Sequence, residues 1–339
     1  MAYSREISIV KQQTSFNTGK APARLSILRY LLPITTWKIK MSHIEWKGVF
    51  PALTTKFTES FQLDLSAFIN NLEVQLKEGV QGIVLGGSLG EASTLTAEEK
   101  TLLTEAAVKH INGRIPVVVN IAEQSTSAAI DAARRAQQDG ACGLMLLPPM
   151  RYKADARETV AYFKTVADAT SLPIMIYNNP VDYGIEVTMD MFSELAACDN
   201  IQAVKESTRD VSNVTRMRNR FGERFSILAG VDTLALEELL MGADGWVAGL
   251  VCAFPRETVA IYNLVQQERR REALEIYRWF LPLLELDTSP KLVQNIKLAE
   301  VATGLGTASV RPPRLPLVGD ELDKVQNTLR VCLATRPTL

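Results

Sequence analysis

The chain has 339 residues, of which 47% are hydrophobic and 22% charged, and its formal net charge is −1, a composition typical of one large globular domain or two small ones. A near-neutral balance without a basic stripe argues against nucleic acid as a partner. Four widely separated cysteines and only two histidines argue against a bound metal and against a disulfide framework. No apolar run is long enough to span a membrane, and we expect a cytoplasmic protein.

The first 40 residues differ from the rest. They carry seven basic residues against one acid, Glu6, so this arm has a net charge of +6 and the remainder −7. An acid-poor arm that bears serine and threonine is compatible with a mitochondrial transit peptide. Alternatively, translation starts at Met41, whose following residues lead directly into the first predicted strand.

From residue 48 onward, short apolar or β-branched runs alternate with helical patterns. The eight predicted strands span residues 49–54, 82–85, 116–121, 143–147, 173–177, 202–205, 226–229 and 245–248. Helical patterns lie between them, for example after Thr96 and Glu99, which have the spacing of a capping box, and over residues 127–138 and 158–169. This alternation predicts an α/β fold, a (β/α)8 TIM barrel over residues 46–255. An open doubly wound sheet would need a glycine-rich turn after the first strand, where residues 51–55 contain no glycine.

Beyond about residue 255 the strand patterns stop. Residues 257–277 and 290–303 predict helices, so residues 256–339 should form a helical C-terminal extension beside the barrel.

The predicted strand over residues 202–205 ends in Lys205. In this fold the active site is built from the carboxyl ends of the strands. A buried lysine should have a lowered pKa, which leaves a neutral amine able to attack a carbonyl or imine carbon, as in Schiff-base enzymes. A lysine at the end of a strand is more often a solvated charge, so this interpretation depends on what lies near it.

Two further segments converge on the same end of the barrel. The turn Gly-Gly-Ser-Leu-Gly-Glu at residues 86–91 could bind a substrate carboxylate through backbone N–H groups and the Ser88 hydroxyl, or its glycines could serve only a tight turn. The fifth predicted strand ends in Tyr177. This phenol either packs with its hydroxyl satisfied or shuttles the protons that imine formation requires.

From about Trp46 to its C-terminus, the chain resembles the dihydrodipicolinate synthase and N-acetylneuraminate lyase superfamily. The resemblance rests on Gly-Ser-Leu-Gly-Glu at residues 87–91, Tyr-Asn-Asn-Pro at 177–180 and Val-Lys-Glu-Ser at 204–207. It implies that Lys205 forms an imine, that Tyr177 shuttles protons, and that Ser88 with the Leu89 backbone N–H holds the carboxylate of a 2-oxo acid. It also implies chemistry without a cofactor or metal, and a homotetramer built as a dimer of dimers. Bacterial members usually begin just before the first strand, which favours a start at Met41.

Two positions depart from the dihydrodipicolinate synthases. Met150 stands where those enzymes carry a tyrosine that reaches the neighbouring subunit's site, so the shared proton relay is missing. Asp182 stands where they bind the carboxylate of the aldehyde substrate with an arginine. A carboxylate there would repel that substrate, which argues against a role in lysine biosynthesis.

A narrower resemblance is to the Δ1-pyrroline-4-hydroxy-2-carboxylate deaminases of hydroxyproline degradation. The shared segments are residues 122–123, 229–232, 245–247, 283–287, 292–298 and 311–315. This resemblance implies a Schiff-base deaminase of the hydro-lyase type that acts on a cyclic imino acid. Val247 and Met150 would then shape the substrate pocket. Glu123 and Asp182 would serve the leaving hydroxyl or the amine, unless both are solvated loop acids.

Two alternatives use the same residues. One is a class I aldolase or dehydratase that acts on a sugar-derived 2-oxo acid with the same Lys205, Tyr177 and Ser88. The other is a catalytically inactive barrel that binds a 2-oxo acid as a sensor or scaffold, which the retention of all three residues disfavours.

Overall fold

The computed structural model describes residues 44–149 and 151–339, in which eight parallel strands form one sheet. The strands are β1 Gly48–Pro51, β2 Ile83–Leu85, β3 Val117–Ile121, β4 Gly143–Leu146, β5 Ile174–Asn178, β6 Ile201–Glu206, β7 Ser226–Ala229 and β8 Gly245–Ala248. Strand β1 pairs with β8, and a single parallel bridge between Ala52 and Val84 spans the gap between β1 and β2. The predicted TIM barrel is therefore confirmed. The basic arm, with its proposed start at Met41, and Met150 lie outside the described residues.

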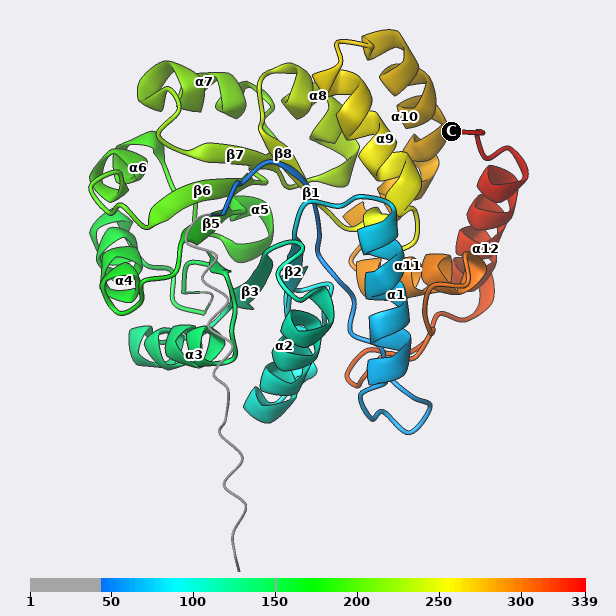
Figure 1. The fold of residues 1–339 in the computed structure, drawn as a ribbon, viewed down its shortest axis with the longest axis horizontal. Helices are drawn as coiled ribbons and strands as arrows, with labels where there is room; N and C mark the ends of the chain where they lie inside the picture. The colour runs from blue at the N-terminus through cyan, green and yellow to red at the C-terminus, as the bar shows by residue number, and fades with distance from the viewer. Residues whose placement is uncertain (1–43, 150) are drawn as a thin grey trace, which may run out of the picture. The chain divides into compact units, whose positions relative to one another are not determined.

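Helices surround the sheet in the order of the chain (Figure 1). They are α1 Leu65–Lys77, α2 Ala97–Ile111, α3 Thr126–Gln138, α4 Ala156–Asp168, α6 Met189–Leu195, α7 Ser212–Phe221 and α8 Ala235–Leu240. Shorter turns, η1 Ala92–Thr94, α5 Pro180–Tyr183, η2 Asp232–Leu234 and η3 Leu250–Cys252, follow strands β2, β5, β7 and β8. The strands are apolar runs because both their faces are buried, as in β3, where all five residues are buried.

The start of α2 illustrates how local sequence sets an element. Thr96 Oγ1 accepts a hydrogen bond from the Glu99 backbone N–H at 3.2 Å, and Glu99 Oε2 accepts one from the Thr96 N–H at 3.0 Å. The predicted capping box is thus present, and it satisfies two N–H groups that a helix leaves unpaired at its start.

The C-terminal segment contains α9 Pro255–Gln266, α10 Arg270–Leu284, η4 Glu285–Thr288, α11 Leu292–Ala302 and α12 Gly319–Ala334. The prediction of one helix over residues 257–277 was wrong. Glu268 adopts a left-handed φ of 60°, and the Arg269 N–H turns back to the Leu264 carbonyl at 2.8 Å, so α9 and α10 are separate helices that pack together. Residues 266–272 are all polar and include neither glycine nor proline, so no usual helix-ending residue marks the reversal in the sequence. Helix α9 packs on β1 and β8 and thereby continues the barrel layer past residue 255.

Helix α12 lies in the predicted helical extension, although no sequence pattern singled it out, and it packs on α10 and α11. No helix in the described part of the chain is long and apolar enough to cross a lipid bilayer.

Two buried ion pairs join α11 to the first two strand ends. Lys297 Nζ lies 2.5 Å from Glu91 Oε1, and Lys56 Nζ lies 2.6 Å from Glu300 Oε1, with all four side chains at most 1% exposed. Burial lowers the pKa of Lys297 and raises that of Glu300, while the paired charges oppose both shifts. Each charge is therefore tolerated only because its partner is present.

We expect Lys297→Met to lower the free energy of unfolding by about 3–5 kcal/mol, because it leaves the Glu91 carboxylate buried without its main counter-charge. Urea denaturation measures this difference. The double variant Lys297→Met/Glu91→Gln should recover much of the loss. Lys291→Met, which breaks a half-exposed pair with Glu321, is the matched control and should cost less than about 1 kcal/mol. Equal losses in the two single variants would contradict the prediction.

Another buried acid, Glu238 of α8, has no hydrogen-bond partner in the described part of the chain. It is 1% exposed, and neither carboxyl oxygen has a hydrogen-bond partner among the described residues. Burial, with a further contribution from the Glu206 carboxylate, raises the pKa of Glu238 from 4.5 to about 9. Glu238 is therefore protonated in the folded protein at neutral pH.

Between about pH 4.5 and pH 9 the folded state holds a proton on Glu238 that the unfolded state has lost, so stability falls as the pH rises. Glu238→Gln removes this loss. As the pH rises across this window, we expect the free energy of unfolding of the variant to increase relative to that of the parent by up to about 1.4 kcal/mol per pH unit. Denaturant unfolding at pH 5, 7 and 9 measures the difference, and parallel pH dependences would count against a raised pKa.

Candidate active site

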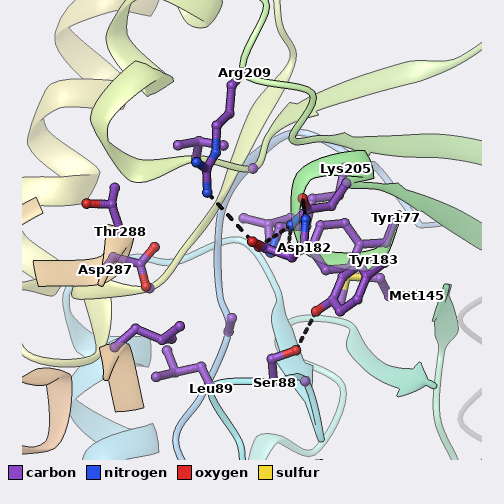
Figure 2. A pocket seen from close by; sticks show the side chains of 18 residues that line it. Ser88, Leu89, Met145, Tyr177, Asp182, Tyr183, Lys205, Arg209, Asp287 and Thr288 are labelled. Carbon is purple, nitrogen blue, oxygen red and sulfur yellow. Dashed lines mark hydrogen bonds and ion pairs between the residues drawn. The ribbon is translucent and has the colours of Figure 1, made fainter. Parts of the chain in front are cut away.

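The carboxyl ends of the strands surround a cavity of about 100 Å³. Six of the eight predicted site residues line it (Figure 2): Ser88, Leu89, Tyr177, Asp182, Lys205 and Val247. They converge because parallel strands present their carboxyl ends at one end of a barrel.

Lys205 lies near the end of β6, next to Tyr177 of β5 in the parallel ladder. The residue is 7% exposed, and its Nζ lies 4.2 Å from the centre of the Tyr177 ring. Burial lowers the pKa of Lys205, although nearby acids such as Asp287 oppose the shift. A larger fraction of neutral amine is therefore available than for a solvated lysine, which is what a nucleophile requires.

The backbone beside Lys205 requires a glycine. A Cβ atom at Gly230 would lie 2.1 Å from Ser207 Oγ and 2.7 Å from Lys205 Cγ, closer than any side chain allows. Gly230 therefore lets β7 and its following turn approach the lysine side chain closely.

Tyr177 is buried, and its hydroxyl accepts a hydrogen bond from Asn179 Nδ2 at 3.1 Å. Burial raises the pKa of Tyr177 to about 12, so the phenol is protonated at neutral pH and can donate a proton. Its ring packs edge-on against Tyr183, with ring centres 5.5 Å apart.

Tyr183 is a lining residue that sequence reasoning missed. Its hydroxyl lies 2.5 Å from Ser88 Oγ, so the two hydroxyl groups are hydrogen-bonded across the cavity. Burial raises the pKa of Tyr183 and keeps it protonated. Helix α5, capped by the Asn179 side chain, brings Tyr183 back over Tyr177. The only sequence signal was its place three residues after the Tyr-Asn-Asn-Pro motif.

The turn that carries Ser88 is held by its own backbone. The Glu91 N–H donates to the Ser88 carbonyl and the Ala92 N–H to the Gly87 carbonyl, both at 3.2 Å. Glu91, which ends the motif, has a left-handed φ of 55° and turns its carboxylate to Lys297, away from the cavity lining. The acid of this motif is therefore structural, whereas its serine faces the cavity.

Asp182 has a partner that the sequence did not suggest. Its Oδ1 lies 3.7 Å from Arg209, a lining residue from the loop after β6, and its Oδ2 accepts from Asn179 Nδ2 at 2.7 Å. The ion pair is about half exposed and contributes little to stability. Because Arg209 offsets the charge of Asp182, the expected repulsion of a second substrate carboxylate is weaker than Asp182 alone would produce.

Glu123 is not among the residues that line the cavity. Its carboxylate lies 3.7 Å from Lys100 Nζ, and both side chains are about one-third exposed. Asp287, in contrast, lines the cavity from η4 in the C-terminal segment. The narrower sequence resemblance included residues 283–287, but it gave the Asp287 carboxylate no role. In the described residues, no cluster of three or more histidines, cysteines or acids could hold a metal ion.

The (β/α)8 fold, with a cavity at the carboxyl ends of its strands, is the architecture of the barrel enzymes. The profile of the Dihydrodipicolinate synthetase family matches residues 45–332, and the chain belongs to that family. The 4-hydroxy-tetrahydrodipicolinate synthase of Exiguobacterium sibiricum is 35% identical over 273 residues, which cover 80% of this chain and 92% of the relative. The protein is therefore a lyase of the dihydrodipicolinate synthase superfamily, whose enzymes act on small molecules.

Solved structures agree with this assignment. Dihydrodipicolinate synthase from Aquifex aeolicus superposes with a TM-score of 0.80 at 31% identity, covering 86% of this chain and 98% of that one. YagE, a prophage protein of the dihydrodipicolinic acid synthase family from E. coli K12 in complex with pyruvate, has a TM-score of 0.80 at 26% identity, covering 85% and 99%.

We expect Gly230→Ala to lower the free energy of unfolding by about 1–3 kcal/mol, because the added methyl group would overlap the residues around Lys205. Gly87→Ala is the matched control. It lines the same cavity, but its nearest neighbour would be Met145 Cε at 4.0 Å, an ordinary contact. Denaturant unfolding compares the two variants. An equal loss of stability would show that overlap of the added methyl group at Gly230 is not what destabilises the protein.

Proposed function

We propose that this protein is a Schiff-base deaminase of the hydro-lyase type. It converts Δ1-pyrroline-4-hydroxy-2-carboxylate to 2-oxoglutarate semialdehyde and ammonia, in hydroxyproline degradation. The observation that carries the proposal is the buried Lys205 amine, with its lowered pKa, beside the protonated Tyr177 phenol in one cavity. The choice of substrate rests on the narrower sequence resemblance and on Asp182 in place of the synthase arginine.

Binding begins at the turn after β2. The Ser88 hydroxyl and the Leu89 backbone N–H would hold the substrate carboxylate, and Tyr183 keeps the Ser88 hydroxyl in the cavity through their hydrogen bond. YagE was solved in complex with pyruvate, which, like the proposed substrate, carries a carboxylate on an electrophilic carbon.

Neutral Lys205 then attacks C2 of the cyclic imine. Transimination opens the ring and leaves C2 as an iminium on Lys205 and a primary amine on C5. Tyr177, whose ring contacts Lys205 Nζ, would carry the protons of these steps. Such general acid–base assistance typically contributes about 10²-fold to 10⁴-fold in rate.

The protonated Schiff base acidifies the C3 hydrogens. Loss of one gives an enamine, which expels the C4 hydroxyl as water and forms a conjugated iminium. This species tautomerises until C5 is an imine. Hydrolysis at C5 releases ammonia, and hydrolysis at C2 frees Lys205 and the semialdehyde. One water is released and two are consumed, so the reaction takes up one water overall.

We further propose that the enzyme works as a homotetramer, a dimer of dimers, in the cytoplasm. With Met150 in place of the tyrosine that synthases share between subunits, a neighbour would shape the pocket without donating protons.

We expect purified protein lacking residues 1–40 to release ammonia from Δ1-pyrroline-4-hydroxy-2-carboxylate. Lys205→Ala should release none, and Tyr177→Phe should be slower by about 10²-fold to 10⁴-fold. An enzyme-coupled ammonia assay measures all three.

Borohydride reduction with pyruvate is the companion measurement, because it traps an adduct on Lys205 whichever substrate is natural. A parent that forms the adduct but releases no ammonia would overturn the deaminase while keeping the Schiff base. Synthase condensation and sugar-derived 2-oxo acids would then be the next assays. A folded parent that forms no adduct would overturn the Schiff-base chemistry itself.

A further inference from the structure

Asp287 faces Lys205 from outside the barrel strands. It belongs to η4, and Figure 2 shows its carboxyl group pointing into the cavity from the wall opposite Tyr177 and Tyr183. The proposed steps above give this acid no task.

The other acids near the cavity already have partners. Asp232 accepts hydrogen bonds from Trp246 Nε1 at 2.9 Å and from the Leu250 N–H at 2.8 Å, and Asp182 is bound by Asn179 and Arg209. Within residues 44–149 and 151–339, no hydrogen bond or ion pair engages the Asp287 carboxyl group. Because Asp287 also lines the cavity, its carboxyl group remains available to whatever fills the cavity.

The position of Asp287 is built into the fold. A Cβ atom at Gly249 would lie 2.7 Å from Asp287 Oδ1, so the carboxyl group rests directly on a backbone that has no side chain. The preceding residue is tied to α11 by a hydrogen bond from Asn295 Nδ2 to the Leu286 carbonyl at 3.0 Å. Helix α11 is in turn held to the barrel by its two buried ion pairs.

The cavity favours the protonated form of Asp287. Burial, together with the charges of Asp232 and Asp182 and against the opposing charge of Lys205, raises its pKa to about 8. A carboxylic acid held neutral in this way can donate a proton at neutral pH, on the opposite side of the substrate from Tyr177.

We propose that Asp287 is a second catalytic acid, which protonates the hydroxyl group leaving C4; this assignment rests on the proposed deaminase function. With the substrate carboxylate at the turn after β2 and C2 bonded to Lys205, the rest of the substrate extends toward the wall formed by Asp287 and Thr288. The C4–O bond breaks as its electrons take the Asp287 proton, and water leaves. The resulting carboxylate then accepts a C5 proton during tautomerisation, which restores the acid for the next turnover.

Asp287→Asn tests this assignment, because asparagine has nearly the same shape but cannot supply a carboxylic proton. Ammonia release should fall by about 10²-fold to 10⁴-fold. Borohydride trapping of pyruvate on Lys205 should stay within about twofold of the parent, since imine formation does not use Asp287. Glu285→Gln is the matched control: it removes an exposed acid from the same η4 turn, outside the cavity lining, and should retain parental ammonia release.

Chemical rescue distinguishes a catalytic role of Asp287 from a purely structural one. Asp287→Ala leaves room for a small acid beside Gly249, and added formate should restore ammonia release by at least about tenfold, as an external general acid would. Loss of activity through altered folding would not respond to formate.

The outcomes distinguish the two proposals. A parent that releases ammonia, with Asp287→Asn within about threefold of it, overturns the role of Asp287 alone. Loss of pyruvate trapping in Asp287→Asn also overturns it, because the residue would then act before elimination. A parent that traps pyruvate but releases no ammonia overturns the deaminase, and the assignment of Asp287 with it.

Discussion

The buried contact between Lys297 and Glu91 joins two parts of the candidate site that lie far apart in the sequence. Glu91 ends the turn that carries Ser88, and Lys297 lies on α11, directly after the η4 turn that carries Asp287. Because neither charge has solvent to stabilise it, any displacement of α11 from the barrel would separate two buried opposite charges at a high cost in free energy. The Lys56–Glu300 pair repeats this constraint one turn further along α11. The two ion pairs thus fix the turn that carries Ser88 relative to the η4 turn that carries Asp287.

Exclusion of water from the cavity shifts the pKa values of the basic and the acidic groups in opposite directions. It lowers the pKa of the Lys205 amine, and it raises the pKa values of the Tyr177 phenol and the Asp287 carboxyl. All three shifts favour the uncharged form, so a nucleophile and two proton donors can coexist at neutral pH without strong mutual repulsion. At the mouth, Asp182 and Arg209 are about half exposed and paired as ions. The cavity therefore has a neutral interior beneath a charged rim.

In the proposed mechanism, imine formation and substrate choice depend on different residues. The sequence resemblance assigns the lysine, the tyrosine and the serine-bearing turn to motifs of the superfamily, and our proposal gives them the imine chemistry. Asp182, Arg209 and Asp287 lie around the part of the cavity that would receive the rest of the substrate. In our proposal, a chain that is 35% identical to a 4-hydroxy-tetrahydrodipicolinate synthase can therefore act on a different substrate.

Local sequence alone determined the barrel and much of the cavity lining. Buried parallel strands must be continuous apolar runs, and strands that follow one another in a barrel place their carboxyl ends together, so Ser88, Tyr177 and Lys205 could be placed at one cavity before any coordinates. Only the tertiary structure decided the role of Glu91, the reversal at Glu268, the partner of Asp182 and the position of Asp287. Each depends on contacts between segments that are separate in the sequence or on one left-handed backbone angle, and hydrophobic periodicity records neither.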